Sequence, residues 1–142
     1  MHKPQNGASG LVILVAEDGD DDLFFMKRAL RAASIQHELR VVSDGQQAID
    51  YLSAENGYED RAKWPLPNLI FLDLKMPRQD GFEVLEWMRR QPALAGIKVV
   101  VLTGSPELRD RQRAQALGVH TYLVKPPTRD MLQALFASLG TA

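Results

Sequence analysis

The sequence predicts an α/β fold in which five parallel strands form one doubly wound sheet. Short apolar runs, most of them rich in branched residues, occupy residues 11–16, 39–42, 69–72, 99–102 and 122–124. Each run is too short for a helix and is typical of a strand buried on both faces. Segments with apolar residues at helical spacing follow the runs, and right-handed crossovers would place these helices on both faces of the sheet.

The spacing of apolar residues and the residues that cap helix N-termini predict where the helices lie. Leu23, Met26 and Leu30 form a helical stripe after the first strand, and residues 131–139 form another after the fifth. The Asp44-Gly45 and Asp80-Gly81 pairs predict the starts of the second and third helices, because aspartate caps a helix N-terminus. The fourth helix, expected at 106–117, has few large apolar residues, so we expect it to be the most mobile helix.

Composition limits the classes of protein. The 142 residues fit one domain, which we expect at 11–142 after a flexible arm at 1–10, with no output domain. A net charge of -1 does not indicate nucleic acid or a membrane as the main partner, and no segment resembles a signal peptide or a membrane span. We therefore expect a cytoplasmic protein. Residues 53–67 predict a surface connection packed by Trp64.

Polar side chains follow four of the five expected strands. Glu17 and Asp18 follow the first strand and Asp73 the third, and Thr103 and Lys125 follow the fourth and fifth. In doubly wound sheets these ends share one edge, where ligands bind. Three carboxylates there would repel one another and raise at least one pKa unless a cation or a lysine compensates.

The chemistry of these carboxylates favours a hard divalent cation. Oxygen ligands without histidine or cysteine suit Mg²⁺ or Ca²⁺, and a sparse, open site favours Mg²⁺. The chain has no cysteine, so thiolate sites and disulfides are excluded. We interpret the three aspartates at 20–22 differently, as the cap and first turn of the following helix, where the helix dipole favours acids.

Asp73 is a candidate nucleophile. It closes the apolar run LIFLD, where a charge is costly unless it is paired or functional. A carboxylate beside Mg²⁺ and a lysine can attack a phosphoryl group. Thr103 would then donate a hydrogen bond to one phosphoryl oxygen and the Lys125 ammonium would contact another.

The segments ILVAEDGDDD, LIFLDLKMPRQDGFEVL, VVVLTGS and YLVKP occur in this order along the chain. Together, over residues 11–139, they resemble the receiver domain of two-component response regulators. The resemblance implies a flavodoxin-like (βα)5 fold with strand order 2-1-3-4-5. The connection at 53–67 and the third helix region are also similar to small regulators paired with phytochrome-like or hybrid histidine kinases.

The resemblance assigns roles to individual residues. Asp73 becomes the phospho-acceptor, with Mg²⁺ held by the Asp18 and Asp73 carboxylates, by Glu17 through water and by the Lys75 carbonyl. Thr103 and Tyr122 become a switch pair in which the ring moves once the threonine contacts the phosphoryl group. The resemblance also implies a cis Lys125-Pro126 peptide. Pro127 stands where the family usually has a larger residue, which leaves the path into the last helix open.

The implied function is that of a single-domain response regulator. It would accept a phosphoryl group from a histidine kinase or histidine phosphotransfer protein and catalyse only its own phosphorylation and dephosphorylation. It would signal to an unidentified protein through the fourth helix, fifth strand and fifth helix. The same surface, with Met131 and Phe136 on the last helix, could form a homodimer.

Three other classes of protein share part of this pattern. A phosphatase of the haloacid-dehalogenase type needs a second aspartate two positions after its nucleophile, and Lys75 stands there. A dinucleotide-binding module needs GxGxxG in the first turn, which reads EDGDDD. The third alternative is a receiver-like binding module that is never phosphorylated. The five site positions all carry competent side chains, which argues against it.

Overall fold

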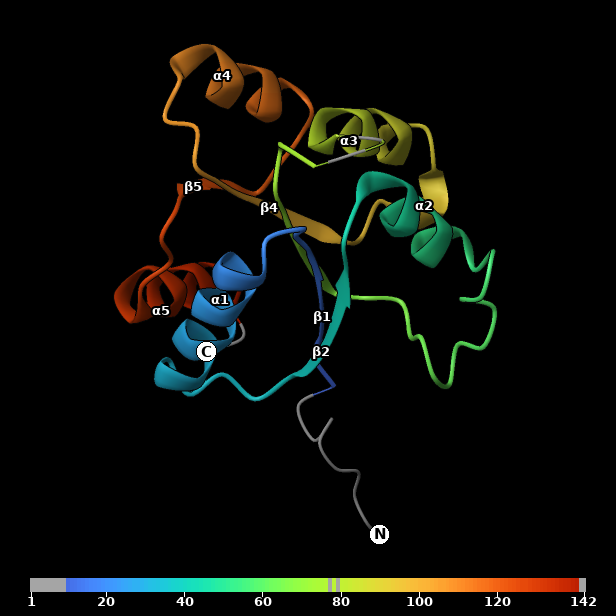
Figure 1. Cartoon of the computed structure of the whole chain (residues 1–142), viewed down its shortest axis with the longest axis horizontal. Helices are drawn as coiled ribbons and strands as arrows, with labels where there is room; N and C mark the ends of the chain where they lie inside the picture. Colours follow the sequence, from blue (N-terminus) through green and yellow to red (C-terminus); the bar gives the residue numbers. More distant parts are fainter. Residues whose placement is uncertain (1–9, 77, 79, 141–142) are drawn as a thin grey trace, which may run out of the picture.

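The computed structural model describes residues 10–76, 78 and 80–140, so the arm expected at 1–10 lies outside the described part except for Gly10. Five parallel strands form one sheet in the order β2-β1-β3-β4-β5, as predicted (Figure 1). The elements in chain order are β1 (Val12–Ala16), α1 (Asp20–Ala32), β2 (Glu38–Val42), α2 (Gly45–Ser53), β3 (Leu69–Leu72), α3 (Gly81–Arg89), the 3₁₀ helix η1 (Pro92–Leu94), β4 (Lys98–Thr103), α4 (Leu108–Ala116), β5 (Thr121–Val124) and α5 (Arg129–Ser138).

The sheet separates two apolar cores. In β1, Ile13 and Val15 belong to the core that α1 and α5 cover, whereas Leu14 and Ala16 belong to the core under α2, α3 and α4. Figure 1 shows the same division, with α1 and α5 on one side of the strands and the other three helices opposite. Burial on both faces explains why the inner strands β1, β3 and β4 are continuous apolar runs in the sequence.

Aspartate caps begin two helices as predicted. The Asp44 side chain accepts a hydrogen bond from the Gln47 N–H at 2.8 Å at the start of α2. Asp80 and Glu83 form a reciprocal capping box at the start of α3. The prediction for α1 is partly wrong, because Gly19 holds the cap position and the three aspartates form only the first turn.

The connection between α2 and β3 is packed by aromatic rings, as the sequence predicts. The Trp64 ring lies 5.1 Å from that of Tyr58 and 6.1 Å from that of Tyr51, measured between centroids. Arg61 donates hydrogen bonds to the carbonyls of Tyr51, Leu52 and Trp64, so its guanidinium also closes the C-terminal end of α2. The segment is therefore an ordered cover for one side of the molecule.

The helix α4 is attached to the sheet mainly by side chains other than large apolar ones. All of its residues are described, and Ala114 is the one that is buried. The Arg111 guanidinium lies 4.8 Å from the Tyr122 ring centroid, and that of Arg113 lies 4.1 Å from the Phe82 ring centroid. The helix begins at Leu108, two residues later than expected.

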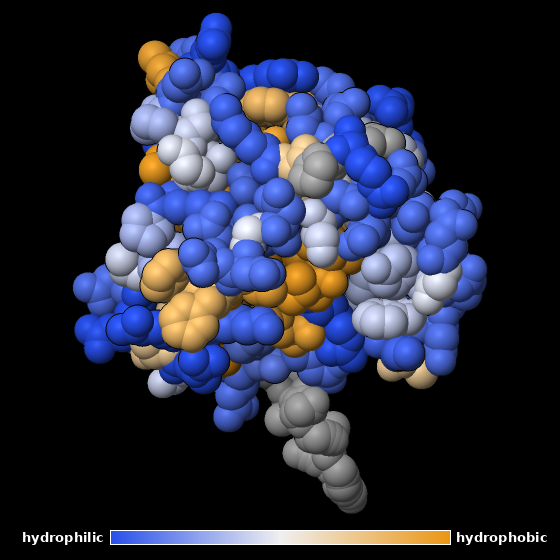
Figure 2. All heavy atoms as spheres, in the orientation of Figure 1, coloured by the Kyte–Doolittle hydropathy of each residue, from blue (hydrophilic) through white to orange (hydrophobic). Residues whose placement is uncertain are grey.

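The visible surface is mostly polar. Figure 2 shows apolar side chains over α1 and over the neighbouring strands. On α1, Phe24 and Phe25 are 56% and 43% exposed, and their rings meet edge to face. In the part of the chain that the structure describes, no helix is both long enough and apolar enough to span a membrane.

Candidate functional site

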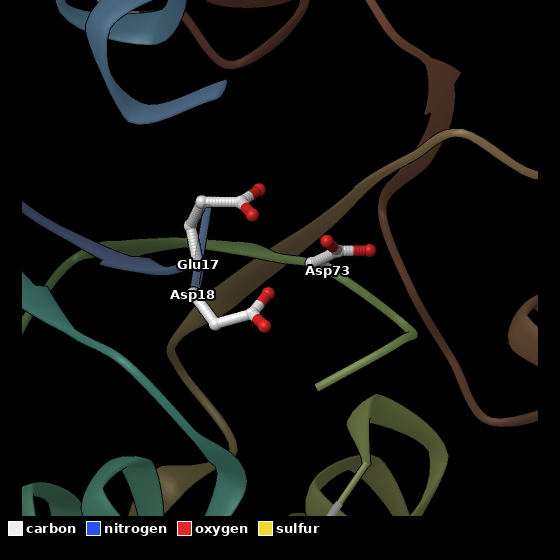
Figure 3. A group of neighbouring side chains, drawn as sticks. All are labelled: Glu17, Asp18 and Asp73. Carbon is white, nitrogen blue, oxygen red and sulfur yellow. The ribbon is translucent and has the colours of Figure 1, made fainter. Parts of the chain in front are cut away.

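The predicted site residues meet at the carboxyl edge of the sheet. Glu17 and Asp18 follow β1, and Asp73 follows β3, its N–H donating to the Ala16 carbonyl at 3.1 Å. One carboxylate oxygen from each of the three lies within 4.8 Å of the others, and Figure 3 shows the three groups together at the two strand ends. Glu17 and Asp73 are buried, whereas Asp18 is exposed, so the cluster opens to solvent on one side.

Lys125 brings a positive charge to this cluster. Its N–H donates to the Thr103 carbonyl at 2.8 Å, which ties the end of β5 to that of β4. Its Nζ lies 2.6 Å from Glu17 Oε1 and 2.9 Å from Asp73 Oδ2. The Lys125–Pro126 peptide is cis, as the resemblance implied. The path after Pro127 is regular, because Thr128 caps α5 by accepting from the Met131 N–H.

A third carboxylate contacts Lys125 and was not predicted from the sequence. Asp22 Oδ2 lies 2.7 Å from Lys125 Nζ, so this first-turn aspartate is a member of the site. The available signal was helical spacing: Asp22 lies four residues before the buried Met26 and therefore on the sheet-facing side of α1. Its neighbours Asp20 and Asp21 are exposed, as expected for a solvated first turn.

The shared ammonium shapes the electrostatics of the site. Burial raises the pKa of Glu17, and the Asp73 charge adds to the rise, although hydrogen bonds from Lys125 and Gly19 oppose it. The sequence analysis expected mutual repulsion to raise the pKa of a carboxylate, whereas burial is the larger cause at Glu17. Burial alone would lower the pKa of Lys125, but its hydrogen bonds to the three carboxylates outweigh burial and raise that pKa.

The donor set fits a hard divalent cation. Three carboxylates face one another at the open edge, which suits the oxygen preference and partial hydration of Mg²⁺. The Lys75 N–H donates to Asp73 Oδ1 at 3.2 Å, which places Lys75 directly beside the cluster. An open cleft of about 570 Å³, lined in part by Asp18, Lys75 and Asp110, gives access from solvent.

Thr103 and Tyr122 are connected through Ser105. Thr103 is fully buried at the end of β4, and its Oγ1 accepts a long hydrogen bond from the Ser105 N–H at 3.4 Å. The Tyr122 hydroxyl donates to the Ser105 carbonyl at 2.8 Å, and Ser105 Oγ donates to Asp110 Oδ2 at 2.7 Å on α4. One residue thus contacts the threonine, the tyrosine and α4, and the sequence analysis did not identify it as a connector.

The fold and the site together define a receiver domain. Residues 13–137 match the response regulator receiver domain, and the chain belongs to that family. Response regulator Rcp1 of Synechocystis sp. is 40% identical over 114 residues, covering 80% of this chain and 76% of that protein.

Solved structures agree with this assignment. The Mn²⁺-bound form of Rcp1 has a TM-score of 0.78 at 37% identity, covering 89% of this chain and 92% of that chain. The phosphorylated cyanobacterial phytochrome response regulator RcpA has a TM-score of 0.76 at 33% identity, covering 91% and 90%. The predicted kinship with phytochrome-linked regulators is confirmed.

Proposed function

We propose that this protein is a phosphorylation-dependent response regulator whose acceptor is Asp73. The observation that carries the proposal is the contact of 2.9 Å between the buried Asp73 carboxylate and Lys125 Nζ, beside the cluster with Glu17 and Asp18. A carboxylate fixed next to an ammonium can attack phosphorus while the ammonium neutralises the developing negative charge.

The proposed phosphoryl transfer is a nucleophilic displacement at phosphorus. An Asp73 carboxylate oxygen attacks the phosphorus of a phosphohistidine, the new O–P bond forms as the P–N bond breaks, and the electron pair leaves with the imidazole. Lys125 donates to one phosphoryl oxygen and the Thr103 hydroxyl to another. Water later attacks the acyl phosphate, which releases phosphate and restores Asp73. The phosphoryl group stays on the protein, so the step modifies the protein itself and turns over no free substrate.

Mg²⁺ is the proposed cofactor. Asp18 and Asp73 would hold it through their carboxylates, Glu17 through water and Lys75 through its carbonyl. A divalent cation bound there supplies charge neutralisation at the phosphoryl oxygens. The Mn²⁺-bound form of the related Rcp1 supports the binding of a divalent cation.

The proposed output is a rearrangement of α4, β5 and α5. When Thr103 donates to a phosphoryl oxygen, its contact with Ser105 changes, and Ser105 is bonded to both Tyr122 and Asp110. The change would therefore reach α4 and the Tyr122 ring together. Leu108, 66% exposed at the start of α4, gives this surface an apolar contact for a protein partner or a second copy. Phe136 is fully buried and serves the core, so a homodimer would use other residues.

The proposed donor is a phytochrome-like or hybrid histidine kinase, or a histidine phosphotransfer protein, in the cytoplasm. Its histidine must reach Asp73, so the docking surface must adjoin the carboxyl edge. Phe24 and Phe25 are exposed on α1, two and three residues after Asp22, which contacts Lys125. Phe25 also lines a cleft of about 250 Å³ with Pro126 and Pro127. We propose that the donor binds at this apolar surface.

The test is incubation with acetyl phosphate, with and without Mg²⁺, followed by intact mass measurement. We expect the wild type to gain one phosphoryl group only with Mg²⁺, and Asp73→Asn to gain none. Asp130→Asn, a change at an exposed aspartate on α5, is the matched control and should behave as the wild type. A gain that survives Asp73→Asn would refute the acceptor assignment.

The rival proposal is a receiver-like binding module that is never phosphorylated. It predicts no gain of mass from acetyl phosphate or from any kinase, and a partner affinity that does not change with the Asp73→Asn substitution. The lysine paired to two buried carboxylates favours the phosphorylated regulator, because a pure binding surface has no need of that buried charge.

A further inference from the structure

The loop between β3 and α3 carries both the proposed acceptor and Lys75. Its α3 end is held closely: the Gly81 N–H donates to the Leu74 carbonyl at 3.0 Å, and a Cβ on Gly81 would come within 2.4 Å of the Asp73 carbonyl oxygen. A second attachment lies further along the loop. There the Arg78 guanidinium reaches across to Asp44, which follows β2 and caps α2.

The Arg78–Asp44 contact is a two-point ion pair. Arg78 Nε lies 3.0 Å from Asp44 Oδ2, and Nη2 lies 3.1 Å from Oδ1. The Asp44 side chain is 11% exposed, and its Oδ1 also accepts the Gln47 N–H. Burial would raise the pKa of Asp44, but the hydrogen bonds from Gln47 and Arg78 outweigh it and lower that pKa. The carboxylate is therefore charged, and the pair is formed, at neutral pH.

The backbone of Arg78 shows what this pair holds in place. Its φ is +65°, in the left-handed region that residues with a side chain adopt at a free-energy cost. The ion pair compensates for that cost and fixes the loop three residues after Lys75. Without the pair, the loop would sample other conformations, and a ligand that needs one conformation would have to order it on binding.

We propose that Arg78 is a positioning residue for the divalent-cation site, which it serves by holding, through Asp44, the loop that presents the Lys75 carbonyl beside Asp73. The inference rests on the proposed function, because it assumes a cation held by Asp18, Asp73 and that carbonyl. Arg78 and Asp44 contribute no ligand themselves. Their contact ties the loop to the start of α2, in addition to the attachment at Gly81.

Arg78 and Asp44 could affect cation binding through their charges alone, and this explanation predicts different changes in affinity from the positioning role. Removing the positive charge of Arg78 would strengthen cation binding if only charge mattered, and removing the negative charge of Asp44 would weaken it. Positioning predicts that both changes weaken binding. Asn is as good a helix cap as Asp, so Asp44→Asn removes the ion pair and leaves the cap of α2 in place. The Arg78 side chain is 59% exposed, so its truncation leaves no cavity.

The test is calorimetric titration of the full chain with Mg²⁺. We expect Arg78→Ala and Asp44→Asn each to weaken Mg²⁺ binding about 10-fold, the lower end of what groups that orient metal ligands contribute. The double variant should bind as each single variant does, because both remove one interaction. Arg78→Lys should recover only part of the affinity, since an ammonium cannot make the two-point contact. Arg109→Ala, which removes an exposed ion pair with Glu107, is the control and should bind as the wild type.

A second readout is hydrogen exchange without Mg²⁺. Amides in peptides containing Lys75 should exchange faster in Arg78→Ala and Asp44→Asn than in the wild type, while those of α5 stay unchanged. Wild-type Mg²⁺ affinity in both variants, or stronger binding in Arg78→Ala, would overturn the positioning role and leave the metal site standing. A wild type that binds no Mg²⁺ would refute the proposed metal site and this inference with it.

Discussion

Lys125 is the residue on which the charge balance of the site depends. Its ammonium contacts two buried carboxylates, Glu17 and Asp73, and the half-exposed Asp22. The described contacts therefore gather three negative charges around one positive charge, and removing the lysine would leave two of those charges buried without their partner.

We predict that Lys125→Met lowers the free energy of unfolding by about 3 kcal/mol at neutral pH, as for a broken buried ion pair. The loss should shrink as the pH falls, because the raised pKa of Glu17 lets that carboxylate take up a proton early. Added Mg²⁺ should restore part of the stability, since it can neutralise the same carboxylates. Urea unfolding at several pH values measures each effect.

Lys98→Met is the matched control, because Lys98 is exposed at the start of β4. It should change the free energy of unfolding by no more than about 0.5 kcal/mol. Equal losses for the two lysine variants would mean that the buried carboxylates do not depend on Lys125.

The position of Gly81 requires a glycine, because two backbone segments approach each other closely there. A Cβ there would lie 2.4 Å from the Asp73 carbonyl oxygen and 2.7 Å from the Leu74 Cα, and neither backbone can rotate away. We predict that Gly81→Ala lowers the free energy of unfolding by about 1–3 kcal/mol through overpacking, despite the better helix propensity of alanine. It should also slow labelling by acetyl phosphate, because the clash displaces Asp73. Gly96→Ala, with no atom within 4 Å of the added Cβ, should leave both measurements unchanged.

At the scale of elements, α3 and α4 form a natural comparison. Each has 9 residues, but α3 buries Gly81, Phe82, Val84, Leu85 and Met88, whereas α4 buries Ala114. We predict that amides of α4 exchange at least about 10-fold faster than those of α3, because less apolar burial opposes local opening. Hydrogen exchange with mass detection measures this. Equal protection of both helices would show that the arginine–ring contacts hold α4 as firmly as an apolar face.

The elements also show what a sequence can reveal. All five strands were predicted to within one residue at each end. The inner strands β1, β3 and β4 are buried on both faces and are apolar runs bounded by polar residues, whereas the edge strands β2 and β5 are only partly buried. Strand ends then located Glu17, Asp73, Thr103 and Lys125, since topology alone brings them to one edge.

The contacts that were missed come from helices and loops. Asp22 reaches the site through the rotation of α1 about its axis, and Ser105 through the path of the loop before α4. Arg78 reaches Asp44 from a left-handed backbone position. Such directions depend on how the elements pack, which the order of residues along the chain does not specify.

At the scale of the whole molecule, the three tyrosines can report on the folding of two regions, the connection between α2 and β3 and the contact between β5 and α4. Tyr51 and Tyr58 lie in the aromatic cluster beside α2, and Tyr122 lies under α4. Burial raises the pKa of each above 10.0.

We predict that the folded protein forms tyrosinate at higher pH than the urea-unfolded chain, which near-ultraviolet absorbance can follow. The unfolded state therefore loses these protons first, so stability should fall as the pH rises above 10.0 toward the folded-state pKa values. Tyr122→Phe should remove one of the three contributions and leave the other two. Superimposed titration curves for the folded and unfolded chains would contradict the burial of these rings.

The placement of the site at the ends of β1, β3, β4 and β5 also bears on synthesis. A nascent chain acquires Glu17 and Asp18 early and Asp73 near its midpoint, but the compensating ammonium of Lys125 arrives only with the last strand. Until then the carboxylates have no described lysine to share, and β4 lacks its neighbour β5. A ribosome-bound chain that stops short of residue 125 should therefore be unable to take up phosphate.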